Sequence, residues 1–295
     1  LRFALDGNLV SARKNLHIAG TLSKTGGGHS VSLRLDKAEV ERPLRWRSFA
    51  VTDGTIDGVC ELTFSDTLSL SSVEANGWLV IESGACRLRH VPEALTDISM
   101  RLALEGNRWK LDSLSGMCMG MHLSGGGVWD NVRHTNSMLL FDLKDIDIEK
   151  VAAGLPPPVY ENVLGNGWCR LRVGKNETGY ETLMSLSAGG VSVLGDPLTQ
   201  CSAELSIHGD VCEVDTVIIQ TPHAGASAFG IVTGTDSVPD YSLSWSAYVD
   251  SLVSIPAIAG DMFADGTLNG QGRSRRLSAR CRLKQLRVGG IPLGN

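Results

Sequence analysis

The sequence predicts an all-β protein, and three observations lead to that prediction. Glycine accounts for 34 of 295 residues, well above the ~7% of average proteins. Apolar and polar residues alternate over short runs such as VSLRLD at 31–36, the period of a half-buried strand. A segment at 95–128 returns in altered form at 198–232. The expected architecture is an elongated, curled, mostly antiparallel β-sheet built from repeats, with an open groove and one or two short helices.

The repeat is LTDISMRLALEGNRWKLDSLSGMCMGMHLSGGGV in its first copy and LTQCSAELSIHGDVCEVDTVIIQTPHAGASAFGIV in its second. Each copy reads as strand, turn, strand, turn, strand. Three pairs of residues share one offset of 103 residues: Leu95 and Leu198, Gly106 and Gly209, and Asp112 and Asp215.

The repeats suggest four segments: 1–75, divergent; 76–162, with a short helix; 163–260, with a short helical segment; and 261–295, the start of a further repeat. The first helix is expected over 145–155 (DIDIEKVAAGL), with Asp147 as its N-cap and Gly154 near its end, before three prolines. The second is expected over 249–260, where Pro256 weakens the pattern. A match between 195–198 (GDPL) and 290–293 (GIPL) marks the further repeat.

Seven Asp-Gly or Asn-Gly pairs are expected to form type I′ hairpin turns, because these residues adopt positive φ readily. They are Asp6-Gly7, Asp53-Gly54, Asp57-Gly58, Asn76-Gly77, Asn166-Gly167, Asp265-Gly266 and Asn269-Gly270.

The net charge of −5 argues against nucleic acid as a partner, because it offers no surplus of positive charge for a phosphate backbone. No apolar run approaches the ~18–20 residues that cross a bilayer. The chain has neither a signal peptide nor an initiator Met, so it is expected to be an internal piece of a longer protein.

Seven cysteines occur without any C-x-x-C pair, which gives no support for a zinc or redox site. They lie in expected strands, where cysteine packs as a small apolar residue. One or two disulfides remain compatible with the sequence. The cysteines are Cys60, Cys86, Cys118, Cys169, Cys201, Cys212 and Cys281.

Alternation also identifies candidate residues for the lining of an apolar groove. Methionines at 117, 119 and 121 fit either ordinary core packing or a soft wall for a variable ligand. The full set of candidates is Met100, Leu102, Leu104, Met117, Met119, Met121, Leu171, Val173, Leu205, Ile207, Val217, Ile219, Leu243 and Trp245.

Arg-x-Arg recurs at 87–89, 170–172 and 280–282. We interpret these arginines as a solvated outer face that discourages edge-to-edge aggregation, with contact to anionic head groups as the alternative. No local metal-ligand spacing, nucleophile elbow or phosphate loop occurs. The sequence therefore predicts no enzyme activity, no cofactor and no metal.

The helical segment, the glycine-containing strands NVLGNGWCRLRVG and VSVLGDPLTQCSAELSIHGDVCEVDTVIIQ, and their return after residue 261 resemble the AsmA/TamB group of bacterial envelope proteins. The resemblance covers most of 76–295. It implies a β-taco, that is, a long open sheet curled along its length. It also implies a periplasmic location, with inner-membrane anchoring through a segment outside this chain, and a connection to outer-membrane assembly proteins. The chain shows neither that anchor nor the C-terminal TamB ending.

Together these features favour a lipid conduit, in which an apolar groove holds phospholipid or fatty acyl chains and passes them between inner and outer membranes. The first alternative is a closed β-solenoid scaffold or adhesion module without lipid. The second is a β-helical enzyme acting on polysaccharide, which would need clustered carboxylates.

Overall fold

The computed structural model describes residues 2–7, 16–21, 28–40, 44–45, 49–64, 73–88, 94–118, 120–130, 137–149, 163–176, 179–193, 196–234, 239–250, 258–271, 274–288 and 291–292. Almost all of these residues are in β-strands. The chain forms two compact units: unit 1 is Leu1–Lys144 with Arg172–Thr178, and unit 2 is Asp145–Leu171 with Gly179–Asn295. The predicted all-β, antiparallel class is confirmed.

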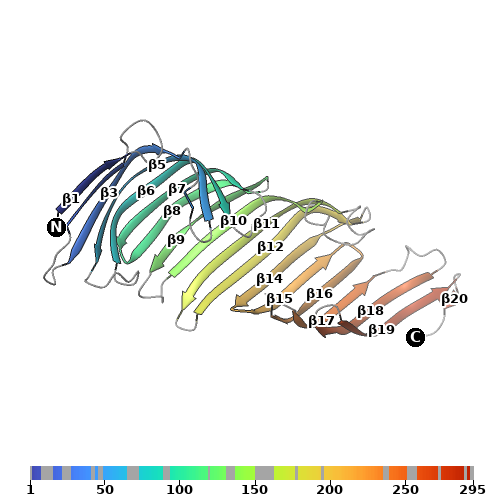
Figure 1. The fold of residues 1–295 in the computed structure, drawn as a ribbon. Helices are drawn as coiled ribbons and strands as arrows, with labels where there is room; N and C mark the ends of the chain where they lie inside the picture. The colour runs from blue at the N-terminus through green and yellow to red at the C-terminus, as the bar shows by residue number, and fades with distance from the viewer. Residues whose placement is uncertain are drawn as a thin grey trace. The chain divides into compact units, whose positions relative to one another are not determined.

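Unit 1 is an open antiparallel sheet in which almost every strand pairs with the next one along the chain. The short β4 pairs with the end of β5, so β3 pairs with β5 directly. The bulged strands β5 and β6 bend along their length (Figure 1), as bulges cause strands to do. The strands are β1 (Arg2–Gly7), β2 (Leu16–Thr21), β3 (His29–Glu39), β4 (Leu44–Arg45), β5 (Phe49–Phe64), β6 (Val73–Leu88), β7 (Leu95–Gly106), β8 (Arg108–Cys118), β9 (Met121–Asp130) and β10 (Ser137–Asp147).

Unit 2 repeats this plan, with β12 and β14 to β19 paired antiparallel in chain order. The two-residue strands β13 and β20 flank β12 and β19 in the same way, at the two positions where the sequence has GDPL and GIPL. The strands are β11 (Val163–Asn176), β12 (Gly179–Val193), β13 (Asp196–Pro197), β14 (Gln200–His208), β15 (Val211–Gln220), β16 (Ala224–Thr233), β17 (Asp240–Val249), β18 (Ile258–Gln271), β19 (Ser274–Val288) and β20 (Ile291–Pro292).

The sequence repeat corresponds to two three-stranded meanders, β7–β9 and β14–β16. Gly106 and Gly209 occupy the first turn of each meander with φ of 62° and 61°, a conformation that favours glycine. Asp112 and Asp215 lie where the register of β8 and β15 shifts by one residue. Each aspartate therefore marks a β-bulge at the same position of its meander.

The Asp-Gly and Asn-Gly pairs do not form the predicted hairpin turns. All seven lie within strands, with Asp6-Gly7 at the end of β1. The reason is the close approach of neighbouring strands. A Cβ at Gly77 would collide with the carbonyl oxygen of Val59, and one at Gly266 with that of Ser278. Glycine is needed here for space in the sheet.

The first predicted helix begins later than the sequence suggested, because β10 continues through Asp147. Of the predicted helix, the described residues are helical at Ile148 and Glu149. The Glu149 N–H donates to Asp147 Oδ1 at 3.1 Å, so Asp147 is the N-cap as predicted. Residues 150–155 lie outside the described residues, as do 251–257 of the second predicted helix, whose ends at Val249 and 258–260 are strand.

Candidate functional site

The sheet of unit 2 has one apolar face, formed by residues that pair directly across six strands, β14 to β19. Three neighbouring rows cross it. The first row is Leu205, Val214, Gly230, Leu243, Leu268 and Leu277. The second is Ala203, Val217, Ala228, Trp245, Gly266 and Ala279. The third is Cys201, Ile219, Ala226, Ala247, Ala264 and Cys281. We call these rows the apolar face of unit 2.

Unit 1 has an apolar face of the same kind, also formed by rows of paired residues. One row is Leu35, Gly58, Leu79, Leu102, Leu111, Gly127 and Leu139. Another is Leu33, Cys60, Gly77, Leu104, Trp109 and Trp129. A third is Ile56, Ile81, Met100, Leu114, Gly125 and Phe141. These rows are the apolar face of unit 1.

Most of the predicted groove residues lie on these two faces. Unit 1 contains Met100, Leu102, Leu104 and Met121, and unit 2 contains Leu205, Ile207, Val217, Ile219, Leu243 and Trp245. Leu171, Cys169 and Gly167 occupy every second position of β11 and therefore share one side of the strand. A Cβ at Gly167 would meet the Ile148 side chain on that side. Val173 follows on the same side of β11 and belongs to unit 1.

The prediction that Met117 and Met121 line the same groove is wrong. Met117 and Met121 do not share a face, because the chain reverses between β8 and β9. Cys118 pairs with Met121, and Met117 pairs with His122, so Met117 points to the opposite, polar face. Met119 lies outside the described residues.

Sequence reasoning missed Leu268 and Leu277, which continue the first row of unit 2 to its last long strand. The signal that could have found Leu277 is the alternation LSARCRL at 277–283. Its leucines are among the most exposed apolar side chains, with 66% of Leu277 and 49% of Leu283 accessible.

Neither apolar face is closed by a second layer within the described residues. No large side chain among them is fully buried, whereas two-layer domains bury such side chains between their layers. Trp245 illustrates the alternative packing: its ring lies over Gly266 of the neighbouring strand. Its indole Nε1 is buried and has no hydrogen-bond partner in the described structure.

None of the seven cysteines forms a disulfide. Strand register places six of them on the apolar faces: Cys60, Cys86, Cys118, Cys201, Cys212 and Cys281. Burial raises the pKa of the Cys60, Cys86 and Cys201 thiols. Burial, and then the carboxylate of Asp215, raises the pKa of Cys212. A raised pKa keeps these thiols protonated near neutral pH, which suits small apolar residues and not nucleophiles.

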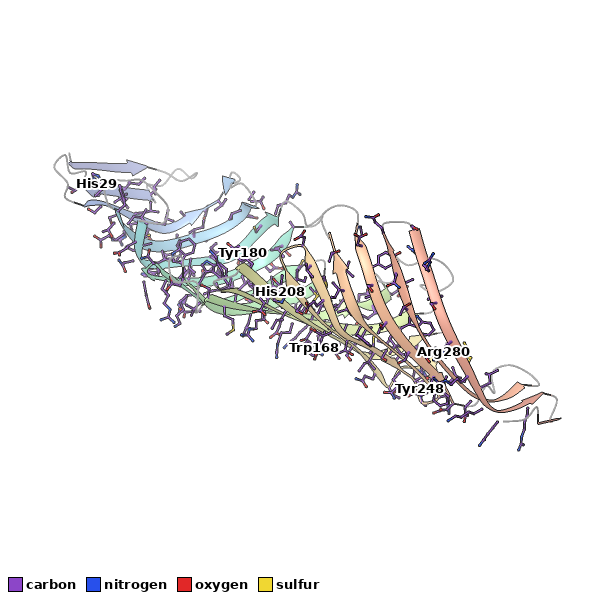
Figure 2. The ribbon with its side chains drawn as sticks, turned by 90° about the horizontal axis from the view of Figure 1, so that it is seen from below. His29, Trp168, Tyr180, His208, Tyr248 and Arg280 are labelled. Atoms are coloured by element: carbon purple, nitrogen blue, oxygen red, sulfur yellow. The ribbon has the colours of Figure 1, made fainter. Side chains whose placement is uncertain are left out.

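The opposite face of unit 2 is polar and holds three arginines of the Arg-x-Arg pairs, Arg170, Arg280 and Arg282. Arg172, the partner of Arg170 in its pair, belongs to unit 1. Arg170 lies over the exposed ring of Trp168, with its guanidinium carbon 5.7 Å from the ring centre. Arg280 (Figure 2) lies on β19 and is exposed. Arg282 lies on the same strand and is also exposed. Their exposure agrees with the predicted solvated face.

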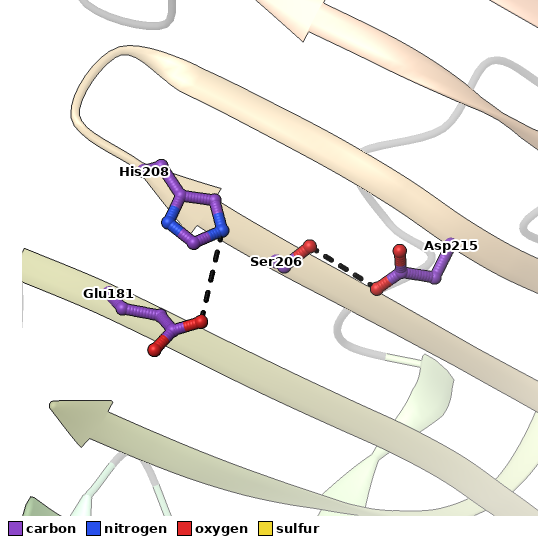
Figure 3. A network of polar contacts seen from close by, with 4 residues as sticks. All are labelled: Glu181, Ser206, His208 and Asp215. Atoms are coloured by element: carbon purple, nitrogen blue, oxygen red, sulfur yellow. Dashed lines mark hydrogen bonds and ion pairs between the residues drawn. The ribbon is translucent and has the colours of Figure 1, made fainter.

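Four polar residues on the polar face of unit 2 have the residue types of a catalytic relay (Figure 3). His208 Nε2 lies 3.9 Å from Glu181 Oε1, and the buried Ser206 hydroxyl donates to Asp215 Oδ2 at 3.3 Å. Serine therefore pairs with aspartate, and histidine with glutamate. A relay needs the serine to donate to the histidine, so this arrangement does not form one. Among the described residues, no group of His, Cys, Asp or Glu could hold a metal ion.

Within the described part of the chain, no helix has the length and hydrophobicity needed to cross a membrane. Comparisons with protein-family models, with curated proteins and with solved structures each gave no match.

Proposed function

We propose that the apolar faces bind the acyl chains of phospholipid or fatty acid, and that the protein is a segment of a lipid conduit in a bacterial cell envelope. The observation that carries the proposal is the pair of apolar faces, each crossed by rows of paired residues and neither closed within the described residues. The periplasmic location, the inner-membrane anchor outside this chain and the contact with outer-membrane assembly proteins rest on the AsmA/TamB resemblance.

The dimensions of the rows fit an acyl chain. Strands in a sheet lie about 4.8 Å apart, so a row across six strands spans roughly 24 Å. One leaflet contributes about 15 Å to a 30 Å hydrocarbon core. The row from Leu205 to Leu277 is therefore longer than one acyl chain and offers it several equivalent positions.

The energetics also suit a passive conduit. Burying one methylene contributes about 0.8 kcal/mol, so about twelve methylenes contribute on the order of 10 kcal/mol. This attraction has no preferred direction, so a chain can move between neighbouring rows without breaking a hydrogen bond. No chemical step is required.

The alternative is a scaffold or adhesion module whose apolar faces are covered by protein and hold no lipid. The two functions differ in what purified protein carries. The first test is organic extraction and mass spectrometry of protein purified without detergent. Near-stoichiometric phospholipid or fatty acid supports the conduit, and a lipid-free, monodisperse protein supports the scaffold.

Photocrosslinking places the lipid on a face. A photoreactive amino acid is introduced at Leu243 and, as the matched control, at Ser244, its neighbour on the opposite face of β17. Leu102 and Ala103 form the same kind of pair on β7. All four side chains are partly buried. We expect lipid adducts at Leu243 and Leu102 only. Equal labelling of both faces would contradict the proposal.

A further inference from the structure

The polar face of unit 2 holds a second group of residues with the chemistry of a binding site. Gly225, Tyr248, Phe263 and Arg282 pair in a row across β16 to β19. The adjacent row on the same face is Ser227, Ser246, Asp265 and Arg280. Two aromatic rings therefore lie beside two arginines, a carboxylate and two hydroxyls.

Two neighbouring hollows lie over these rows. One has a volume of about 240 Å³ and is lined by residues that include Gln220, Ser227 and Tyr248. The other has a volume of about 320 Å³ and is lined by residues that include Phe263, Asp265 and Lys284. Ser246 and Tyr248 line both, so the hollows adjoin. We call them together the aromatic platform.

The aromatic rings are held in place before any ligand binds. Gln220 Nε2 donates to the hydroxyl of Tyr248 at 2.7 Å, and the Tyr248 ring lies over Gly225, where a Cβ would meet the ring. The Lys284 amine lies 5.2 Å from the centre of the Phe263 ring. Fixed rings lose little conformational entropy when a ligand stacks on them.

The charge of the platform differs from that of the whole chain, which carries −5. Alternate residues of β19 place four cations on the polar face: Arg276, Arg280, Arg282 and Lys284. Arg282 lies 4.0 Å from Asp265, and two thirds of its side chain is exposed. Arg276 and Arg280 have no ion-pair partner within the described residues. Two carboxylates of β18 share this face, Asp261 opposite Lys284 and Asp265 opposite Arg280. The four cations of β19 outnumber them, so the face is complementary to an anion.

We propose that the aromatic platform binds an acidic polysaccharide, a chain of sugar residues that carry carboxylates. The rings of Tyr248 and Phe263 provide flat apolar surfaces for the C–H faces of sugar rings. Arg280 and Arg282 pair with the carboxylates through two N–H groups each. The Asp265 carboxylate accepts hydrogen bonds from sugar hydroxyls. The Ser246 hydroxyl can donate to them or accept from them.

Two features favour a glycan over other anions. Asp265 lies in the middle of the platform, where it would repel the continuous charge of a nucleic acid but can accept hydrogen bonds from hydroxyl groups. The Tyr248 ring lies against its own sheet, so it is not available to insert into a membrane. The site is on the opposite face from the proposed lipid rows, so the two proposals stand or fall separately.

The test measures binding of an oligogalacturonate to the whole protein by calorimetry. Three further probes show which property of the ligand is recognised. The methyl-esterified oligosaccharide has the sugars without the charge, and polyglutamate has the carboxylates without the sugars. Oligo-dT represents nucleic acid. We expect oligogalacturonate to bind at least about tenfold more tightly than any of the three. Equal or tighter binding of polyglutamate or oligo-dT, equal binding of the ester, or no binding of oligogalacturonate would overturn the proposal.

Two pairs of variants place the site. The double variant Arg280→Ser with Arg282→Ser is compared with Arg275→Ser, on the same strand but the opposite face. Phe263→Val is compared with Phe229→Val, another exposed phenylalanine of the polar face that lines neither hollow. The first member of each pair should weaken binding by about tenfold or more, and the control by less than about twofold. Circular dichroism confirms the fold, and equal losses in a pair would refute the assignment.

Discussion

The two units share one plan but differ in how far they cover their own apolar faces. Unit 1 contains two clusters of buried residues, one around Leu35 and Ile56 and the other around Cys60 and Leu104. Unit 2 contains one such cluster, around Val191. Nine of the twelve buried hydrophobic residues belong to unit 1. On the apolar face of unit 2, by contrast, Ile219, Leu277 and Leu283 are exposed.

Side-chain size explains the difference. The rows of unit 1 consist mainly of Leu, Ile, Met and aromatic residues, which contact one another across strands. Two of the three central rows of unit 2 are mainly Ala, Gly and Cys. Small side chains leave large neighbours such as Leu277 uncovered. The comparison suggests that unit 1 is stabilised by its own packing, whereas unit 2 leaves more apolar surface for a ligand.

The largest expected effect is a difference in the cost of truncating leucine. Leu104 is 8% exposed and packs with Cys60 and Ala75, so Leu104→Ala should lower the free energy of unfolding by about 2–4 kcal/mol. Leu243→Ala, on the more open face of unit 2, should cost about 1 kcal/mol. Urea unfolding followed by circular dichroism measures both. Equal losses would show that the units are packed equally well.

Crowded strand glycines should be costly in both units, which tests what the units share. A Cβ at Gly266 would collide with the Ser278 carbonyl and press on the Trp245 ring, and one at Gly125 would press on Phe141. Gly266→Ala and Gly125→Ala should each cost about 1–3 kcal/mol. Gly189→Ala, with open space around its Cβ, is the control. A stable Gly266→Ala protein would mean that these strands are farther apart than described.

Thiol ionisation should reduce stability at alkaline pH. Burial raises the pKa of Cys60 in unit 1 and of Cys201 in unit 2 from 9.0. The unfolded thiols ionise first as pH rises, so stability is full below pH 9.0 and falls as pH passes through the raised values. The urea midpoint should fall as pH rises above 9.0, and Cys60→Ala with Cys201→Ala should flatten that fall. If the double variant shows the same dependence of the urea midpoint on pH, other ionisable groups cause the fall.

The smallest effect on stability is expected at the exposed end of the apolar face of unit 2. Leu277→Ser should change the free energy of unfolding by less than about 0.5 kcal/mol, because two thirds of the side chain is already in water. Lipid recovered in organic extracts should nevertheless decrease if the row holds acyl chains. Ser278→Ala, on the opposite face, should leave the lipid unchanged. A decrease in both variants would point to a general disturbance of β19.

Local alternation was enough to predict strands and most of the apolar face. It identified Leu102 and Leu243 because each lies in a regular stretch with polar neighbours. It failed between Met117 and Met121, where the chain turns inside an apolar run without a turn-forming pair of residues. The ligand could not be predicted in the same way, because apolar spacing is the same for a ligand surface and for a protein interface.

Tertiary register accounts for the other errors. Gly77 and Gly266 resembled turn glycines, yet each is glycine because the backbone of the next strand leaves no room for a Cβ. Spacing along the sequence does not reveal such a contact between strands. The aromatic platform was missed for the same reason, since Tyr248, Phe263 and Arg282 come from three strands. Its one local signal was the run of alternating basic residues near 280.

The bulges at Asp112 and Asp215 also bear on how this protein can change in length during evolution. Leu111 and Leu114, three residues apart, both face the apolar side because one extra residue lies between them. Deleting that residue would restore ordinary alternation and leave both leucines facing the same way. A deletion elsewhere in the strand would turn every following side chain to the wrong face. The bulge is therefore the position at which related sequences can lose one residue and keep the same apolar face.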